Sequence, residues 1–204
     1  MILQRSLKKP LNKNYLCEKN IRAIGIDDGF FKPRQSGNTK IVAVLMRADS
    51  RIEGILFSDV TVDGLDSTQR IIEMLCSNRP KFIGQAKAIF LSGVNFAGFN
   101  IVDIDGLYSV LKTPIIVVFR KKPRMQKIRE ALKCFTDSSK RMGLIKKAGR
   151  IYRTDKIFFQ CKGIKPKHAK AFIKIFSLHS NLPEPVRVAH LIASASTLGR
   201  STSP

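Results

Sequence analysis

The chain has few acidic residues, and this scarcity bounds its function more than any other feature of its composition. Fifteen Asp and Glu stand against 37 Lys and Arg in 204 residues, which gives a formal net charge of +22. Such an excess suits a polyanionic partner, and it makes the position of each carboxylate informative. A lysine-rich proteome is the alternative explanation, but it predicts a diffuse excess rather than a clustered one.

Other absences exclude whole classes of protein. No apolar run approaches the ~18 residues of a membrane span, and residues 1–19 contain no apolar segment ahead of a cleavage site. We therefore expect a cytoplasmic protein that does not enter a membrane. The cysteines form no Cys-x-x-Cys pair, which indicates reduced thiols rather than a zinc ribbon, a disulfide framework or a disulfide-linked partner. They are Cys17, Cys76, Cys134 and Cys161.

The positive charge is concentrated in one part of the chain. Residues 112–174 contain 20 Lys and Arg against three acids, whereas residues 27–111 contain ten acids against nine Lys and Arg. This division is typical of a nucleic-acid-binding surface beside a core that is able to bind metal. The basic side chains predicted to hold the phosphate backbone are Lys121, Lys122, Arg124, Lys146, Lys147, Arg150 and, further along, Arg187.

The hydrophobic pattern predicts a mixed α/β sheet with helices packed on it, in a single domain over residues 21–204 behind a basic, flexible arm at 1–20. Three apolar runs separated by turn-forming segments predict an antiparallel meander. They cover residues 21–26, 41–46 and 52–62. Continuous apolar runs predict buried strands at 88–91 and 114–119, and a further strand at 157–159. Helical spacing or proline signals predict helices at 66–75, 101–111, 123–135, 166–178 and 185–198, and a short helix and loop within 140–153.

Carboxylates gather at the ends of the predicted elements. Asp27 and Asp28 end the first strand, where a carboxylate pair suits a hard divalent cation. Side chains alternate along a strand, so we expect only one of the two to share a site with neighbouring strands. The alternative is that both serve the turn at Gly29.

The remaining candidate acids sit where helices begin. Asp63 and Asp66 lie between the third strand and the first helix, and Asp66 is placed to cap that helix with Gln69 three residues later. Asp103 precedes the crossover helix and Glu184 begins the last one. Since the helix dipole alone favours an acid at such positions, each of these candidate ligands has a structural alternative.

A loop rich in glycine and asparagine follows the first buried central strand. Two glycines and two asparagines at this point indicate a tight loop that approaches a ligand closely. It lacks the Lys-Ser/Thr of a P-loop. The predicted substrate contacts are Ser92, Gly93, Asn95, Gly98, Asn100 and, from the last helix, His190. Ser67 or Ser92 with His190 would resemble a hydrolase, but no Gly-x-Ser-x-Gly elbow is present.

Four motifs, read in order, resemble the archaeal endonuclease dU family, which was long a domain of unknown function and is similar to endonuclease V. They are IGIDDGFF at 24–31, VDGLDST at 62–68, SGVNFAGFNIVD at 92–103 and PEPVRVAH at 183–190. The resemblance implies an RNase H-like fold and cleavage of a phosphodiester bond assisted by Mg²⁺ or Mn²⁺. It also implies a role in DNA repair, with DNA that contains deoxyuridine or another deaminated base as the substrate.

By position, the resemblance implies Asp27, Asp66 and Asp103 as catalytic residues. The implied metal ligands are drawn from Asp27, Asp63, Asp66, Asp103 and Glu184. In endonuclease V the third ligand is an Asp at the end of the fourth strand, where this chain has Ser92, so Asp103 or Glu184 would have to complete the site.

Two further readings stay open. A non-catalytic nucleic-acid-binding protein would keep the fold and the basic surface. The IGIDDG segment is also similar to the first phosphate motif of actin-like ATPases, but the chain leaves little room for their second half. Candidate side chains for stacking on a displaced base are Phe30, Phe31, Phe96 and Phe99, each of which could equally belong to the core.

Overall fold

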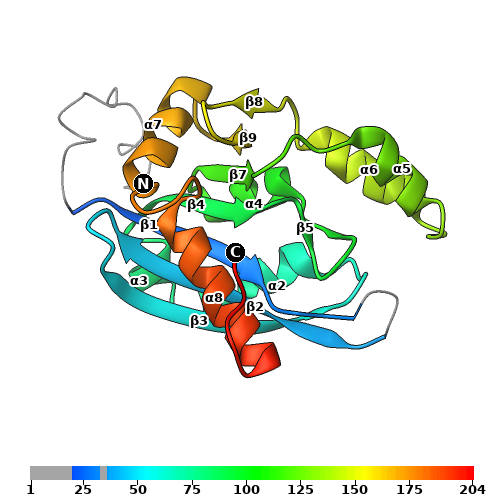
Figure 1. The fold of residues 1–204 in the computed structure, drawn as a ribbon, viewed down its shortest axis with the longest axis horizontal. Helices are drawn as coiled ribbons and strands as arrows, with labels where there is room; N and C mark the ends of the chain where they lie inside the picture. Colours follow the sequence, from blue (N-terminus) through cyan, green and yellow to red (C-terminus); the bar gives the residue numbers. More distant parts are fainter. Residues whose placement is uncertain (1–19, 33–35) are drawn as a thin grey trace.

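A seven-stranded mixed sheet forms the centre of the computed structural model, which describes residues 20–32 and 36–204 (Figure 1). The strand order is β3-β2-β1-β4-β7-β9-β8. The predicted meander is confirmed as the antiparallel strands β1 (Arg22–Asp28), β2 (Asn38–Arg47) and β3 (Ile52–Thr61). The predicted arm at residues 1–20 lies, apart from Asn20, outside the described residues.

The other half of the sheet is built on the buried strands. β4 (Ala86–Ser92) and β7 (Ile115–Phe119) run parallel to β1, as their continuous apolar sequences predict for strands covered on both faces. β9 (Phe158–Lys162) and β8 (Tyr152–Arg153) complete the far edge in antiparallel pairing. A small ribbon of β5 (Asn95–Phe96) and β6 (Asn100–Ile101) lies in the loop after β4.

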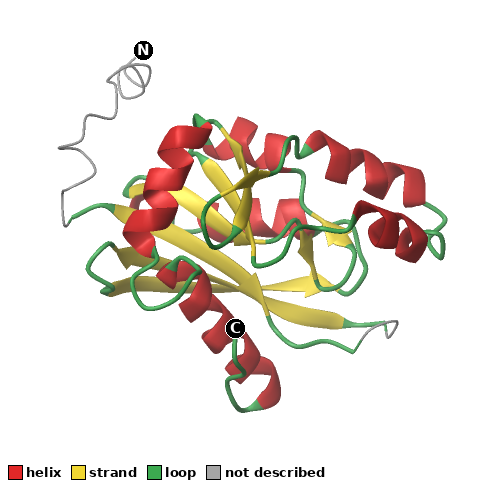
Figure 2. Ribbon diagram, turned by 45° about the horizontal axis from the view of Figure 1, so that its top comes forward, coloured by secondary structure: helices red, strands yellow, loops and turns green. Residues whose placement is uncertain are grey.

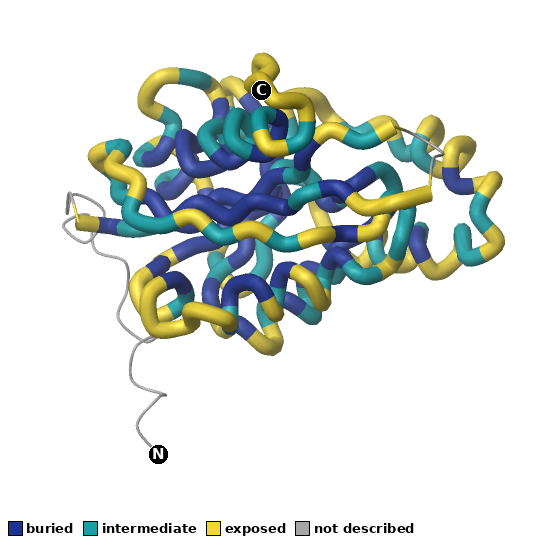
Figure 3. The backbone as a smooth tube through the Cα atoms, turned by 90° about the horizontal axis from the view of Figure 1, so that it is seen from below, coloured by how far each residue is buried: buried dark blue, intermediate teal, exposed yellow. Residues whose placement is uncertain are grey.

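Helices cover both faces of the sheet, so that the strands form a buried layer between them (Figures 2 and 3). One face packs against α2 (Ser67–Cys76), α4 (Ile104–Leu111), α5 (Met125–Leu132) and α6 (Ser138–Lys147). The opposite face packs against α7 (Pro166–Phe176) and α8 (Glu184–Leu198). The short α3 (Arg79–Phe82) leads into β4.

Three predictions from the sequence need correction. The capping box at Asp66 does not form, because the Asp66 carboxylate bonds to Thr61 and Asn100 and makes no cap bond to α2. The crossover helix starts at Ile104 rather than near residue 101, since Asp103 caps it and the preceding residues form β6. β8 occupies residues predicted as loop.

Within the part of the chain that the structure describes, no helix is long and apolar enough to cross a membrane. Cys76, Cys134 and Cys161 are free thiols.

Helix α8 lies directly on β1, and glycine makes this close approach possible. A Cβ atom at Gly25 would lie 2.1 Å from the backbone carbon of Pro185, and one at Gly29 would lie 2.8 Å from the carbonyl oxygen of Ala193. Side chains at alternate positions of a strand point to one face, so Asp27 also points toward α8. The helix therefore runs along three successive positions of one strand face.

We expect Gly25→Ala to destabilise the protein by about 1–3 kcal/mol, because the added methyl group overpacks the contact with α8. Denaturant unfolding would measure this change. Gly143→Ala is the matched control: its Cβ would meet nothing within 4 Å, and alanine within α6 should stabilise the helix by about 0.5–1 kcal/mol. Equal stability of Gly25→Ala and the wild type would contradict the packing described here.

Candidate active site at the ends of the parallel strands

Two cavities with a shared wall open where β1, β4 and β7 end. Their volumes are about 1170 and 630 Å³, and both are lined by Asp28, Ser92 and Arg120. The strand register explains this placement, since Ile26 pairs with Leu91 and Ser92 pairs with Val118. The carboxyl ends of parallel strands are where open α/β sheets bind their ligands.

Asp27 and His190 form a buried pair in the smaller cavity. Nδ1 of His190 lies 2.9 Å from Oδ2 of Asp27, and Asp27 is only 5% exposed. The hydrogen bond to Asp27 raises the pKa of His190 above its usual range, while partial burial opposes the shift. Nε2 of the imidazole lies 3.2 Å from the Thr202 hydroxyl. The carboxylate thus orients the imidazole and favours its protonated form.

Asp28 is more deeply involved in the site than its sequence position predicts. Its Oδ2 accepts a hydrogen bond of 2.7 Å from the backbone N–H of Ala97, and its carboxyl group lines both cavities. Burial and the neighbouring charge of Asp27 raise the pKa of Asp28 to about 7. The two aspartates leave β1 toward different partners, as strand alternation predicts, yet both carboxylates reach the smaller cavity.

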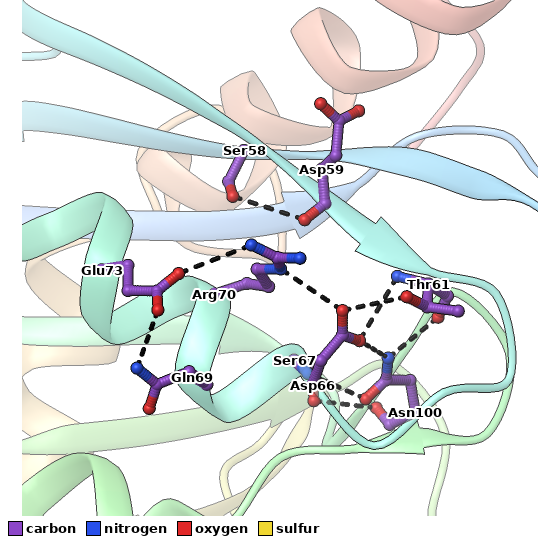
Figure 4. A network of polar contacts seen from close by, with 9 residues as sticks. All are labelled: Ser58, Asp59, Thr61, Asp66, Ser67, Gln69, Arg70, Glu73 and Asn100. Atoms are coloured by element: carbon purple, nitrogen blue, oxygen red, sulfur yellow. Dashed lines mark hydrogen bonds and ion pairs between the residues drawn. The ribbon is translucent and has the colours of Figure 1, made fainter.

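Asp66 belongs to a polar network (Figure 4), and it lines neither cavity. Its carboxylate accepts hydrogen bonds from the Thr61 hydroxyl at 2.9 Å and from the Asn100 amide at 2.6 Å, and Arg70 pairs with it. Asn100 is fully buried and also accepts a bond from the Ser67 backbone N–H. These bonds hold the pKa of Asp66 below its usual range against the effect of burial. The network joins β3, α2 and β6.

The other three candidate ligands have partners of their own. Oδ1 of Asp63 accepts the Phe99 backbone N–H at 2.8 Å. Asp103 caps α4 and pairs with Lys147 at 2.8 Å. Glu184, buried at the start of α8, pairs with Arg187 at 2.8 Å.

The structure therefore does not gather Asp27, Asp66 and Asp103 into one site. Among residues 20–32 and 36–204, no three His, Cys, Asp or Glu side chains are arranged to hold a metal ion. Of the acidic residues that the structure describes, Asp27 and Asp28 are the two that line these cavities.

The predicted basic residues divide into three groups. Lys121, Lys122 and Arg124 line the larger cavity, and sequence reasoning missed Arg120 and Lys127 beside them. Arg120 and Lys127 both fall within residues 112–174, so the charge excess of that segment could have identified them as candidates. None of these five forms an ion pair with a described residue.

The second group lies at the end of α6, where Lys146 is exposed, Lys147 pairs with Asp103 and Arg150 packs over the Tyr152 ring. The third group is Arg187 alone, which forms an ion pair with the buried Glu184. Its guanidinium is therefore already neutralised by a carboxylate.

The loop after β4 supplies much of the cavity wall. Ser92, Gly93, Asn95 and Gly98 line the larger cavity, whereas Asn100 faces the polar network inside the protein. Phe31 lines both cavities and Phe30 the smaller one. The other two stacking candidates are core residues: Phe96 is fully buried and Phe99 packs edge-on against Phe135.

Arg141 holds this loop in place through hydrogen bonds to main-chain carbonyls. No sequence pattern predicted this role. The side chain is 5% exposed, and its Nη1 donates to the carbonyl oxygens of Gly64 at 2.9 Å and Phe99 at 2.6 Å. Its Nε donates to Asp137 at 2.7 Å. A buried arginine on α6 thus ties that helix to the turn after β3 and to the loop that lines the cavity.

The architecture is that of the RNase H-like proteins. Endonuclease V of Ciona intestinalis, solved in complex with a 24mer DNA containing an inosine followed by a ribo-adenosine, is similar with a TM-score of 0.58 at 14% identity over 88% of this chain and 86% of that one. At this identity the likeness shows the fold alone, and it confirms the predicted class.

The chain belongs to the Endonuclease dU family, whose model matches residues 19–197. A UPF0215 protein of Methanothermobacter thermautotrophicus is 42% identical over 93% of this chain and 95% of its own length. The crystal structure of a protein of unknown function from Archaeoglobus fulgidus superposes with a TM-score of 0.79 at 36% identity, covering 86% of this chain and 98% of that one. The predicted family is confirmed.

We expect the stability of the protein to fall as the pH rises from about 4 to about 7, because folded Asp28 keeps a proton that the unfolded chain releases. Asp28→Asn should reduce this loss, seen as a smaller change in denaturation midpoint between about pH 4.5 and about pH 6.5 with a chelator present. His190, whose folded pKa is raised, adds its own loss only above about pH 6.5, outside that window.

Asp59→Asn, at an exposed position of β3, is the control for the loss of one carboxylate. It should leave the pH dependence as in the wild type. The same pH dependence in the wild type and in Asp28→Asn would show that Asp28 does not titrate as described.

Proposed function

We propose that this protein is a metal-dependent endonuclease that hydrolyses a phosphodiester bond in DNA containing deoxyuridine or another deaminated base. One observation carries the proposal: the Asp27 and Asp28 carboxylates and a wall of unpaired basic side chains share cavities at the ends of β1, β4 and β7. A phosphodiester needs both elements, since cationic groups bind its charge and carboxylates bind a cation. Membership of the Endonuclease dU family supports the reaction class.

The donor set fits a hard divalent cation. Mg²⁺ prefers oxygen ligands and commonly binds through one or two carboxylates, with water and substrate phosphate completing its shell. Asp27 and Asp28 would hold it, with the hydroxyl of Ser92 at the same strand edge. Burial next to each other disfavours two negative charges, and a divalent cation would relieve this repulsion. When bound, such an ion lowers the pKa of water and stabilises charge on the phosphate.

The protein's own residues supply orientation and proton handling. Asp27 fixes the His190 ring through Nδ1, which leaves Nε2 as the nitrogen that can exchange a proton in the cavity. The hydrogen bond to Asp27 raises the pKa of His190 in the protein without metal, and the imidazole lines the smaller cavity, where Nε2 would donate a proton to a leaving oxygen. Arg120 and Lys121 line both cavities and Lys122 the larger one, where they would hold the phosphate backbone.

Base recognition would fall to the loop after β4. Gly93 has φ of +92°, and a Cβ there would meet only the Asn95 backbone, at 3.9 Å and beyond, so a planar group could approach the main chain closely. Asn95 and Phe31 on the same wall offer amide hydrogen bonds and an aromatic face.

A non-catalytic nucleic-acid-binding protein is the second candidate function. The observation that favours it is Ser92, which stands at the end of β4 without a carboxylate, so that the acidic pair has no third acid beside it. This candidate predicts salt-sensitive binding that is indifferent to the loss of Asp27.

We expect the full-length protein to nick a uracil-containing duplex with Mg²⁺ or Mn²⁺ and to be inactive with a chelator. Asp27→Asn and Asp28→Asn should each lower the rate about 100-fold or more, in the range seen when one group that stabilises the transition state is removed. Binding to the duplex without metal should be unchanged or slightly tighter, because one negative charge is lost. Gel-resolved cleavage and fluorescence anisotropy would measure the two quantities.

Asp155→Asn is the matched control, since this exposed aspartate lies outside the cavities. It should cleave as the wild type does. Tight binding without cleavage of any deaminated substrate would reject the nuclease in favour of the second candidate. Full activity of Asp27→Asn and Asp28→Asn, with loss in Asp66→Asn or Asp103→Asn, would place the metal elsewhere.

A further inference from the structure

Helix α7 presents a face of unpaired lysines away from the candidate active site. Its apolar side chains pack on the sheet, with Ala169, Phe172, Ile173 and Phe176 buried. Three lysines on the helix are exposed, with a fourth at its N-cap. They are Lys165, Lys167, Lys170 and Lys174, here called the α7 lysines.

The spacing of these lysines works against the stability of the helix. Lys167, Lys170 and Lys174 follow one another at intervals of three and four residues, so they share one face, and like charges at these spacings destabilise a helix. The helix itself contains no acidic residue. Lys165 and Lys167 also lower the pKa of His168, an effect second to its partial burial. The positive potential at this face is therefore not neutralised within the protein.

Several charged side chains on other elements are paired. Arg70 on α2 pairs with Asp66 and Glu73, and Lys162 on β9 pairs with Asp105. By contrast, none of the α7 lysines forms an ion pair with any residue in the described ranges. Helix α6 also lacks acids, but Arg141 and Lys147 on it pair with Asp137 and Asp103. The α7 lysines have no such acid from a neighbouring element among the described residues.

We propose that the α7 lysines are a second contact for nucleic acid, which hold the phosphate backbone of the duplex outside the cleavage site. The inference rests on the proposed function, which places nucleic acid in the cavity. Basic residues continue from one region to the other: Arg153 and Lys156 lie in the β8–β9 hairpin, where Phe158 lines the larger cavity. Figures 1 and 2 show α7 beside this hairpin.

A nucleic acid fits this face better than a lipid surface does. A helix that binds a membrane needs large apolar side chains exposed beside its basic residues. None of the exposed large apolar side chains belongs to α7. Leu178, just beyond the helix end, is a single exposed apolar residue and not the apolar face that a membrane helix needs. A row of lysines matches a line of phosphates, because phosphate contacts depend on charge and not on base sequence.

The test reverses the charge of three α7 lysines. One variant, the α7 variant, combines Lys167→Glu, Lys170→Glu and Lys174→Glu. The control variant combines Arg51→Glu, Lys81→Glu and Lys87→Glu. The control changes net charge equally at exposed positions outside the cavities and α7. Circular dichroism and denaturant midpoints verify that both variants fold.

On a uracil-containing duplex of about 30 base pairs, roughly 100 Å long, we expect the α7 variant to bind about 10- to 100-fold more weakly than the control near 0.15 M salt. The slope of log affinity against log salt should fall by about two to three, since each phosphate contact contributes about 0.9. With a duplex of about 10 base pairs, roughly 34 Å long, the two variants should cleave at the same rate.

Equal binding of the α7 variant and the control on the long duplex overturns the inference and leaves the nuclease proposal intact. Absence of cleavage by the wild type on every duplex overturns the nuclease proposal, while the binding comparison still reports on the α7 lysines. Loss of wild-type binding to vesicles of anionic phospholipid in the α7 variant, with unchanged DNA binding, assigns the face to a membrane and also overturns the inference.

Discussion

The direct contact between helix α8 and strand β1 is the constraint on which the candidate site depends. Gly25 and Gly29 have no side chains, so the helix backbone lies against the strand at both positions. Asp27 is the residue between them on the same face, and it meets His190 there. The pair therefore results from packing between segments 163 residues apart. A bulkier residue at either glycine would move the helix, and with it the imidazole.

The few acids of this chain are used mainly to build the fold. Asp66 and Asp63 hold the turn after β3 against the loop after β4, Asp103 caps α4, and Glu184 accepts bonds at the start of α8. Each carboxylate is satisfied by backbone N–H groups, amides or cations, as buried acids must be. Among the acids in residues 20–32 and 36–204, Asp27 and Asp28 are the ones that line a cavity. The candidate site is thus marked by Asp27 and Asp28, the two acids that line a cavity in addition to their contacts within the fold.

Local sequence predicted the elements well because hydrophobic periodicity reflects which face of each strand or helix is buried. The meander, the parallel strands and most helices followed from apolar spacing alone. The capping box failed for a physical reason: Asn100, more than thirty residues further along the chain, offers Asp66 a stronger set of bonds than the helix N-terminus does. No local pattern reveals such a distant partner.

The roles of single site residues were harder to predict for the same reason. Asp28 was expected to turn away from the site or to serve the turn, but the Ala97 backbone N–H holds its carboxyl in the cavity wall. Arg141 had no sequence signal, because its acceptors are main-chain carbonyls that any residue provides. By contrast, the basic residues at 121–124 were predictable, since charge density is visible without a fold.

The division of charge along the sequence becomes a division in space. Residues 27–111, which are close to neutral, build the end of β1, strands β2 to β6 and helices α2 to α4. The strongly basic residues 112–174 build β7 to β9, α5, α6 and most of α7. Since β4 and β7 are neighbours in the sheet, the border between the two segments runs through its middle. The larger cavity opens at that border and is lined by residues of both segments: Asp28 and the loop after β4 from the first, and Arg120 to Lys127 from the second. The cavity thus combines a carboxylate from one segment with basic side chains from the other, an arrangement that neither segment provides alone.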